Sequence, residues 1–261
     1  MALTAFPAGF AAGLFGIGGG LITVPILFYI FGSFGIEQSY LMHLAVGTSF
    51  SIIIPTSIAS VLAHKKHGSV DFGIIKSYGS FVISGVLIGT FFAALMKTKM
   101  LLVFFSTVVF ILGTYLLLLQ EKVGEIKKKF GFYPKILCGF ISGFVSAPMG
   151  IGGAVMNVPI LRYFGYPINI AIGSAAAVGF IIALFGAIGF LVSGTFMQAN
   201  LPLSLGFINI PTFLIFVPIT TFMARIGANA AHRINKIKLQ KLFGIFLYIV
   251  GTVFLYRHLS I

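Results

Sequence analysis

Two short glycine clusters are the parts of this sequence whose residue types and spacing suit the binding of a ligand. Residues 16–20 read GIGGG and residues 150–154 read GIGGA, and the sequence VPIL follows each of them. Adjacent glycines break a helix, because they adopt backbone angles that other residues avoid. The half-helix that begins near Gly20 or Ala154 would present free N–H groups and a positive partial charge. Two such ends, brought together, would form a site for an anion.

Neutral polar side chains stand at matching places after the two breaks. Thr23 and Asn157 each come two residues before the proline. Thr48 and Ser174 correspond in the next apolar segment, and Ser49 follows Thr48. These groups can donate hydrogen bonds to a small oxyanion. They can equally bond their own helix backbone, and the glycines can serve to pack helices closely. The predicted substrate-binding residues are Gly18, Gly19, Gly20, Thr23, Thr48, Ser49, Gly152, Gly153, Ala154, Asn157 and Ser174.

The charged residues favour an anion as the substrate. The four acidic residues all fall in or beside loops, at Glu37, Asp71, Glu121 and Glu125. Proton pumps and many cation carriers need carboxylates inside the membrane, and no apolar segment here has one at its middle. Arg225 is the charge closest to the middle of a span, and it either faces the substrate or extends to the membrane surface. His43 stands at the edge of a span, where an interfacial position is expected.

Spacings typical of enzymes and metal sites are missing. Gly13, Gly16 and Gly18 suggest a phosphate-binding loop, but no lysine follows them and no strand–helix–strand pattern surrounds them. The five histidines have no HExxH spacing, and no catalytic triad is visible. The single cysteine, Cys138, excludes an intramolecular disulfide and a cysteine metal site. The sequence therefore predicts no enzyme, no metal and no cofactor.

The composition indicates that the predicted helices face lipid and not water. The chain is 59% hydrophobic and 8% charged, whereas about a quarter of the residues in a soluble domain are charged. Its apolar stretches run near the roughly 20 residues of a membrane-spanning helix, which excludes a barrel. The net charge of +13 comes from basic residues in short loops, so it indicates topology and not nucleic acid. Residues 1–6 lack the basic region of a signal peptide. The expected partners are the bilayer and a small anion, with a monomer and a homodimer both left open.

The chain contains related halves. Three segments recur in the same order: residues 16–27 match 150–161, residues 45–49 match 171–175, and glycines and polar residues of 68–114 match those of 206–252. Internal repeats of this kind are common in transporters. We therefore expect a first membrane repeat at 1–119, a cytoplasmic linker at 120–135 and a second membrane repeat at 136–261.

The positive charges choose between two topologies. Six apolar segments look like crossings, at 43–63, 74–96, 100–119, 170–193, 211–231 and 239–256. If both broken segments return to their own side as re-entrant hairpins, most of the 17 basic residues lie on one face. If each broken segment crosses once, they divide almost evenly, against the positive-inside rule. The prediction is an all-α protein of two inverted repeats, each with a hairpin and three crossings, in the inner membrane with both termini outside.

At the two breaks the sequence resembles the TauE/SafE sulfite exporter family, also called the 4-toluene sulfonate uptake permease family. The resemblance covers nearly the whole chain and extends to residues 47–49 and 68–71. The second half departs from the pattern at Pro148, Met149 and Ala154. The matching residues are Gly9, Gly13, Gly16, Gly18, Gly19, Gly20, Pro25, Gly139, Gly143, Gly150, Gly152, Gly153 and Pro159.

What the resemblance implies is export or uptake of sulfite, sulfoacetate, organosulfonates or related sulfur anions and carboxylates. Together with the site predicted from the residues, it leads us to expect a secondary transporter that works by alternating access around the paired half-helix ends. A passive anion channel is the alternative, because inverted re-entrant hairpins are also compatible with a channel.

Overall fold

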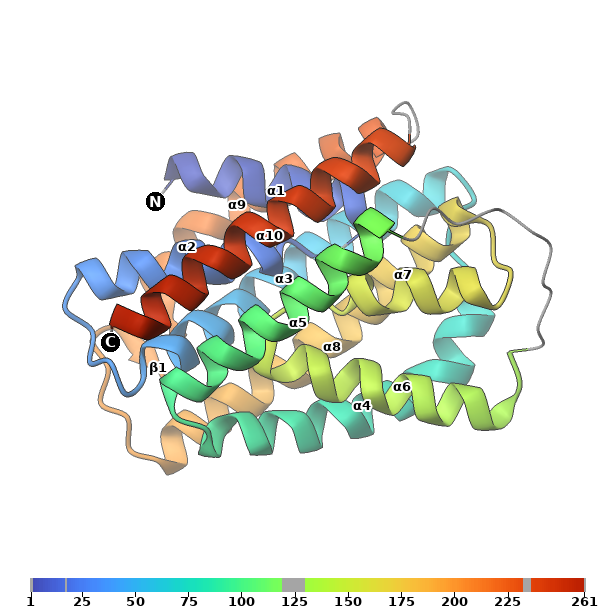
Figure 1. Cartoon of the computed structure of the whole chain (residues 1–261). Helices are drawn as coiled ribbons and strands as arrows, with labels where there is room; N and C mark the ends of the chain where they lie inside the picture. Colours follow the sequence, from blue (N-terminus) through green and yellow to red (C-terminus); the bar gives the residue numbers. More distant parts are fainter. Residues whose placement is uncertain (1, 17, 119–129, 232–235, 261) are drawn as a thin grey trace.

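The computed structural model describes residues 2–16, 18–118, 130–231 and 236–260, and these residues form helices and one short strand hairpin (Figure 1). The helices are α1 (Ala2–Phe15), α2 (Gly20–Ser33), α3 (Leu41–Lys66), α4 (Phe72–Leu95), α5 (Thr98–Leu118), α6 (Phe132–Met149), α7 (Ala154–Tyr163), α8 (Ile168–Phe196), α9 (Ile210–Ala231) and α10 (Lys236–Ser260). Strands β1 (Ser204–Leu205) and β2 (Ile208–Asn209) pair antiparallel, a detail that the sequence did not predict. Residues 119–129 of the predicted linker lie outside the described residues.

Five helices among the described residues are long and apolar enough to cross a membrane, namely α3, α4, α5, α8 and α9. They coincide with five of the six predicted crossings. The sixth predicted crossing lies in α10, where the apolar piece Leu247–Tyr256 is too short to span alone and the side chains of residues 236–240 lie outside those described. The prediction of an all-α, multi-pass membrane protein is confirmed.

Both glycine clusters interrupt the helices where the sequence predicts it. The half-helices after the breaks begin at Gly20 and Ala154. Just before them, Gly19 and Gly153 have φ angles of 81° and 67°, in the left-handed region that favours glycine. The half-helix α7 has 10 residues, so at 1.5 Å per residue it reaches only about halfway through a hydrocarbon core.

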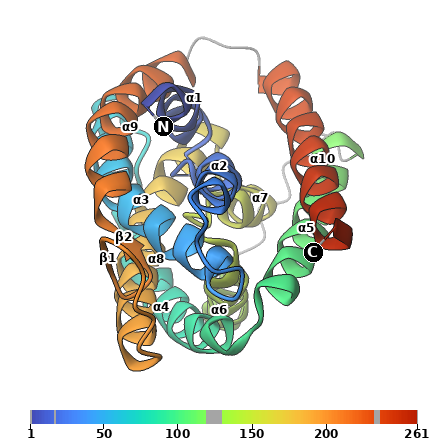
Figure 2. The ribbon, with the colours of Figure 1, turned by 90° about the vertical axis from the view of Figure 1, so that its left-hand side faces the viewer.

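The broken segments fold back on themselves. Figure 1 shows α1 entering from the end of the molecule where both chain termini are marked, and α2 returning to that end. The pair α6 and α7 does the same from the opposite end. Figure 2, a view onto the end with the termini, shows α1 and α2 end-on and next to each other. Both broken segments are therefore hairpins that enter and leave on one side.

Each hairpin packs against a helix of the other half of the chain. Helix α1 packs along α9 of the second half, and α6 packs along α4 of the first half. The other large sets of contacts between the halves join α3 to α8, α5 to α10, α3 to α9 and α4 to α8, so each pairing is matched by its counterpart. Helix directions and pairings of this kind are those that a pseudo-twofold axis in the membrane plane would give. On this basis we propose that the halves are inverted repeats.

The proposed orientation can be tested by cysteine labelling. His67 follows α3 and Gln198 follows α8, and both are exposed. In a Cys138→Ser background, we expect His67→Cys to react only from the cytoplasm and Gln198→Cys only from outside, because Lys65 and Lys66 precede His67. An impermeant maleimide added to intact cells and to inverted vesicles gives the measurement. Reaction of both positions from one side would disprove the six-crossing topology.

Candidate functional site

The two glycine breaks meet in the interior of the protein. A Cβ atom added to Gly20 would lie 2.3 Å from the carbonyl oxygen of Gly150 and 2.8 Å from the Cα of Ile151. The N-terminus of α2 therefore touches the backbone of the other break, and only glycine allows this approach. Ser49 on α3 fixes the junction, because its hydroxyl donates a 2.9 Å hydrogen bond to the Gly150 carbonyl.

In the first break, the Thr23 side chain bonds to the backbone at the start of its own helix. The Thr23 hydroxyl is buried and donates to the carbonyl of Gly19 at 3.1 Å. The backbone N–H groups of Ile22 and Thr23 donate to the same carbonyl. Beside it, an added Cβ at Gly18 would lie 3.3 Å from the Ser57 hydroxyl of α3. Thr23 is thus adjacent to the predicted site but already has a partner.

In the second break, a buried polar cluster surrounds Asn157. The Asn157 side-chain oxygen accepts hydrogen bonds from the Tyr78 hydroxyl at 2.7 Å and the Ser142 hydroxyl at 2.8 Å. These two donors orient the amide, so its Nδ2 group points elsewhere. Among the described residues, neither Asn157 Nδ2 nor the Ser146 hydroxyl has a hydrogen-bond partner. Both are buried, and buried donors without partners are rare in native proteins.

The two unpartnered groups converge on the start of α7. A Cβ added to Gly153 would lie 3.1 Å from Asn157 Nδ2 and 3.2 Å from the Ser146 hydroxyl. Gly153 immediately precedes the first turn of α7, where the Met156 and Asn157 N–H groups donate to the Gly153 carbonyl, so the helix itself offers no acceptor to the N–H groups of Ala154 and Val155. Backbone and side-chain donors are therefore gathered around Gly153, and a small oxyanion is the ligand that such a set of donors fits. The Ile182 Cδ1 atom lies 2.1 Å from the same Cβ position, so this side chain would have to move to admit a ligand.

In the first half, an apolar side chain stands at the place that corresponds to Ser146. A Cβ added to Gly19 would lie 3.2 Å from the Cβ of Ala12, just as Gly153 lies against Ser146. The two breaks share a backbone arrangement, and each has a buried, unpartnered hydroxyl beside it, Ser57 at the first and Ser146 at the second. Within the described residues, only the second break also has an unpartnered side-chain amide, Asn157 Nδ2. Tyr78, Ser142 and Ser146 were missing from the sequence-based prediction. For Ser142 and Ser146, the only signal in the sequence was their spacing, which is four residues and places both on one face of a helix.

Two predicted ligands lie elsewhere and hold loops. The Thr48 hydroxyl accepts from the backbone N–H of Asn209, and the Ser174 hydroxyl accepts from that of Asp71, each at 2.9 Å. Asp71 in turn accepts from the N–H of Gly73 and caps α4. Thr48 and Ser174 therefore correspond as the sequence indicated, and each supports the loop that leads into a helix of the other half. The structure does not bring them into the cluster at Asn157.

The remaining predicted residues pack closely at the junction. Gly152 lies against α8, because a Cβ added to Gly179 would be 2.4 Å from its carbonyl oxygen. Ala154, the first residue of α7, is fully buried. The expectation of an interfacial His43 is wrong: this side chain is buried, with its Nε2 atom 3.2 Å from the Ala93 carbonyl and its ring 5.1 Å from that of Phe207.

The chemistry of this junction is that of binding. Its donors are neutral amides and hydroxyls, which ligate an anion without exchanging protons with it at ordinary pH. No group of three or more histidine, cysteine or carboxylate side chains that could hold a metal ion occurs within the described part of the chain.

Comparisons with known proteins agree with the predicted resemblance. The model of the sulfite exporter TauE/SafE family matches residues 1–254. A probable membrane transporter protein of Haemophilus influenzae is 33% identical over 94% of this chain and 92% of its own length. Another from Methanocaldococcus jannaschii is 29% identical over 97% of this chain and 93% of its own. No solved structure gives a significant match. By the extent of these matches, the chain belongs to the TauE/SafE sulfite exporter family.

Proposed function

We propose that this membrane protein is a secondary transporter of small sulfur-containing or organic anions, such as sulfite or organosulfonates. The observation that supports the proposal most directly is the pair of buried, unpartnered donors, Asn157 Nδ2 and the Ser146 hydroxyl, at the start of α7. The substrate would bind there, where the two glycine breaks meet. Gly18, Gly19, Gly20, Gly152, Gly153 and Ala154 would supply the close backbone, and Thr23 and Ser49 would support it.

The energetics of such a site favour an anion. A hydrogen bond from a neutral donor to a charged group contributes roughly 1.5–3 kcal/mol. A helix N-terminus adds about 0.3–1 kcal/mol when exposed and more when desolvated. Several such donors can offset the dehydration of a small oxyanion. A cation would meet the same positive partial charges unfavourably, and no carboxylate belongs to the junction as described above.

The burial of the junction favours alternating access over a channel. Thr23, Ser49 and Asn157 are all buried to within about one per cent of their surface. A passive channel needs a continuous path past its binding site. Here the two hairpins would have to separate on one side and then on the other, which is the motion of a transporter built from paired repeats. We further propose an inner-membrane location with both chain termini outside.

Flux in proteoliposomes tests this function. We expect saturable uptake of sulfite or an organosulfonate that exceeds equilibrium when an ion gradient is imposed and stops when that gradient is collapsed. Uptake of sodium, potassium or an organic amine should stay at the level of empty liposomes. Anion flux that only equilibrates, with or without a gradient, would instead support the channel. Saturable cation transport without any response to oxyanions would refute the anion site.

A further inference from the structure

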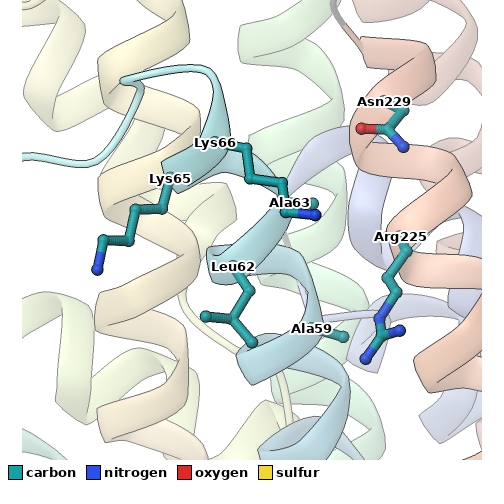
Figure 3. A pocket seen from close by; sticks show the side chains of 7 residues that line it. All are labelled: Ala59, Leu62, Ala63, Lys65, Lys66, Arg225 and Asn229. Carbon is teal, nitrogen blue, oxygen red and sulfur yellow. The ribbon is translucent and has the colours of Figure 1, made fainter.

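A second site for an anionic group lies far from the glycine breaks in sequence, in a groove between the C-terminal ends of α3 and α9. Its volume is about 530 Å³, within the usual range of small-molecule sites. Figure 3 shows Lys66 on α3 directed toward α9, and Arg225 and Asn229 on α9 directed toward α3. The Lys65 side chain points away from α9. The residues that line the groove are Ala59, Leu62, Ala63, Lys65, Lys66, Arg225 and Asn229.

The groove is basic at one end and apolar along its length. Ala59 and Ala63 are buried and form a floor of small side chains. Leu62 is 51% exposed, although it belongs to a helix that spans the membrane. Ile58, one turn before it on the same face of α3, is exposed as well. An apolar surface left open at this depth faces lipid chains.

Arg225 is the residue that needs explaining. It lies one turn after Phe222 on the same face of α9 and directly before Ile226 in the sequence, and both of these are exposed apolar side chains of a membrane-spanning helix. Lys65 and Lys66 occupy the last turn of α3, where the helix dipole favours a cation. Arg225 lies before the last turn of α9, which ends at Ala231, so the dipole does not explain it. A guanidinium among lipid-facing residues calls for an anionic partner. Among the described residues that line the groove, none is a carboxylate.

We propose that this groove binds the phosphate headgroup of an anionic glycerophospholipid. Lys66 and Arg225 hold the phosphate, and the Asn229 amide lies beside them. One acyl chain runs over the alanine floor past Leu62 and Ile58. Basic pockets between helix ends on the cytoplasmic side recognise anionic headgroups in this manner. The apolar, laterally open wall is what distinguishes a lipid from a soluble oxyanion as the occupant, since a soluble ion gains nothing from it.

Lipid binding to the full-length protein tests the proposal. Purified protein in a neutral detergent is titrated with phosphatidylglycerol, with phosphatidylcholine and with inorganic phosphate, and bound lipids are counted by native mass spectrometry. We expect phosphatidylglycerol to bind in preference to phosphatidylcholine. Arg225→Gln and Lys66→Gln should each weaken that binding about five-fold, which corresponds to the roughly 1 kcal/mol that one basic residue contributes near an anionic membrane surface.

Matched variants separate a site from a general charge effect. Lys99→Gln removes an exposed lysine from the first turn of α5, outside the groove, and should leave phosphatidylglycerol binding unchanged. Arg225→Lys keeps the charge and should retain most of the binding, which also shows that this position tolerates substitution. Equal loss in Lys99→Gln and Arg225→Gln would overturn the proposal. Binding of inorganic phosphate that is lost in Arg225→Gln, with phosphatidylglycerol binding no better than phosphatidylcholine, would overturn the proposal in favour of a soluble ion.

Discussion

Replacing Gly20 by alanine is expected to reduce anion transport about ten-fold or more while the protein remains inserted in the membrane. The added Cβ would lie 2.3 Å from the Gly150 carbonyl oxygen, so the two breaks would have to move apart. Overpacking of this kind costs about 1–3 kcal/mol in a tightly packed interior. The backbone donors at the start of α2 would no longer face the second break. Initial rates of sulfite flux in proteoliposomes with equal protein content give the measurement.

Gly32→Ala is the matched control for this variant. Gly32 belongs to the same helix, and a Cβ there would lie 3.8 Å from its nearest neighbour, the Leu41 Cδ1 atom. Alanine is also the better helix former. Transport by Gly32→Ala should therefore equal that of the unmodified protein. If Gly20→Ala transports equally well, the contact between the breaks has no part in transport, and the site must be sought elsewhere.

Replacing Asn157 by alanine is expected to reduce transport by about 10- to 100-fold. The change removes the Nδ2 donor that points to the start of α7, and one hydrogen bond to a charged group contributes roughly 1.5–3 kcal/mol. Thr23→Ala, at the corresponding place of the first half, should have a much smaller effect, because the Thr23 hydroxyl already bonds to the Gly19 carbonyl. Rates over a range of sulfite concentrations measure both variants.

Ser146→Ala separates a loss of function from a loss of folding. The Ser146 hydroxyl is buried without a partner among the described residues, so its removal should raise the melting temperature or leave it unchanged. If the hydroxyl binds substrate, transport should fall in the same variant. Unchanged transport in both Asn157→Ala and Ser146→Ala would show that the cluster only stabilises α7.

The fold could be predicted from the sequence to the extent that hydrophobic length and glycine spacing determine it. The start of α2 at Gly20 and of α7 at Ala154 followed from the glycine clusters, because a left-handed residue must precede each helix there. The short pairing of β1 and β2 had no such signal, since strands of two residues carry no periodicity.

The candidate site was predicted only in part, because repeats show which residues correspond and not which residues touch. Thr48 and Ser174 do correspond, yet each hydroxyl bonds to a loop of the other half. The opposite error concerns Tyr78. Its partner Asn157 belongs to the other half, and Thr23, which corresponds to Asn157, bonds to its own helix instead. A comparison of the two halves cannot reveal a contact between them that has no counterpart.

The packing of each hairpin against the other half of the chain has a consequence for the way this chain matures during synthesis. Helix α1 ends at Phe15, but its main packing partner, α9, begins at Ile210 and leaves the ribosome only after most of the chain has been made. The first hairpin therefore lacks its packing partner α9 until translation is nearly complete. Contacts between residues so distant in sequence form slowly. The intermediate that lacks α9, with the small-residue face of α1 uncovered, is the stage at which membrane chaperones and proteases would meet this protein.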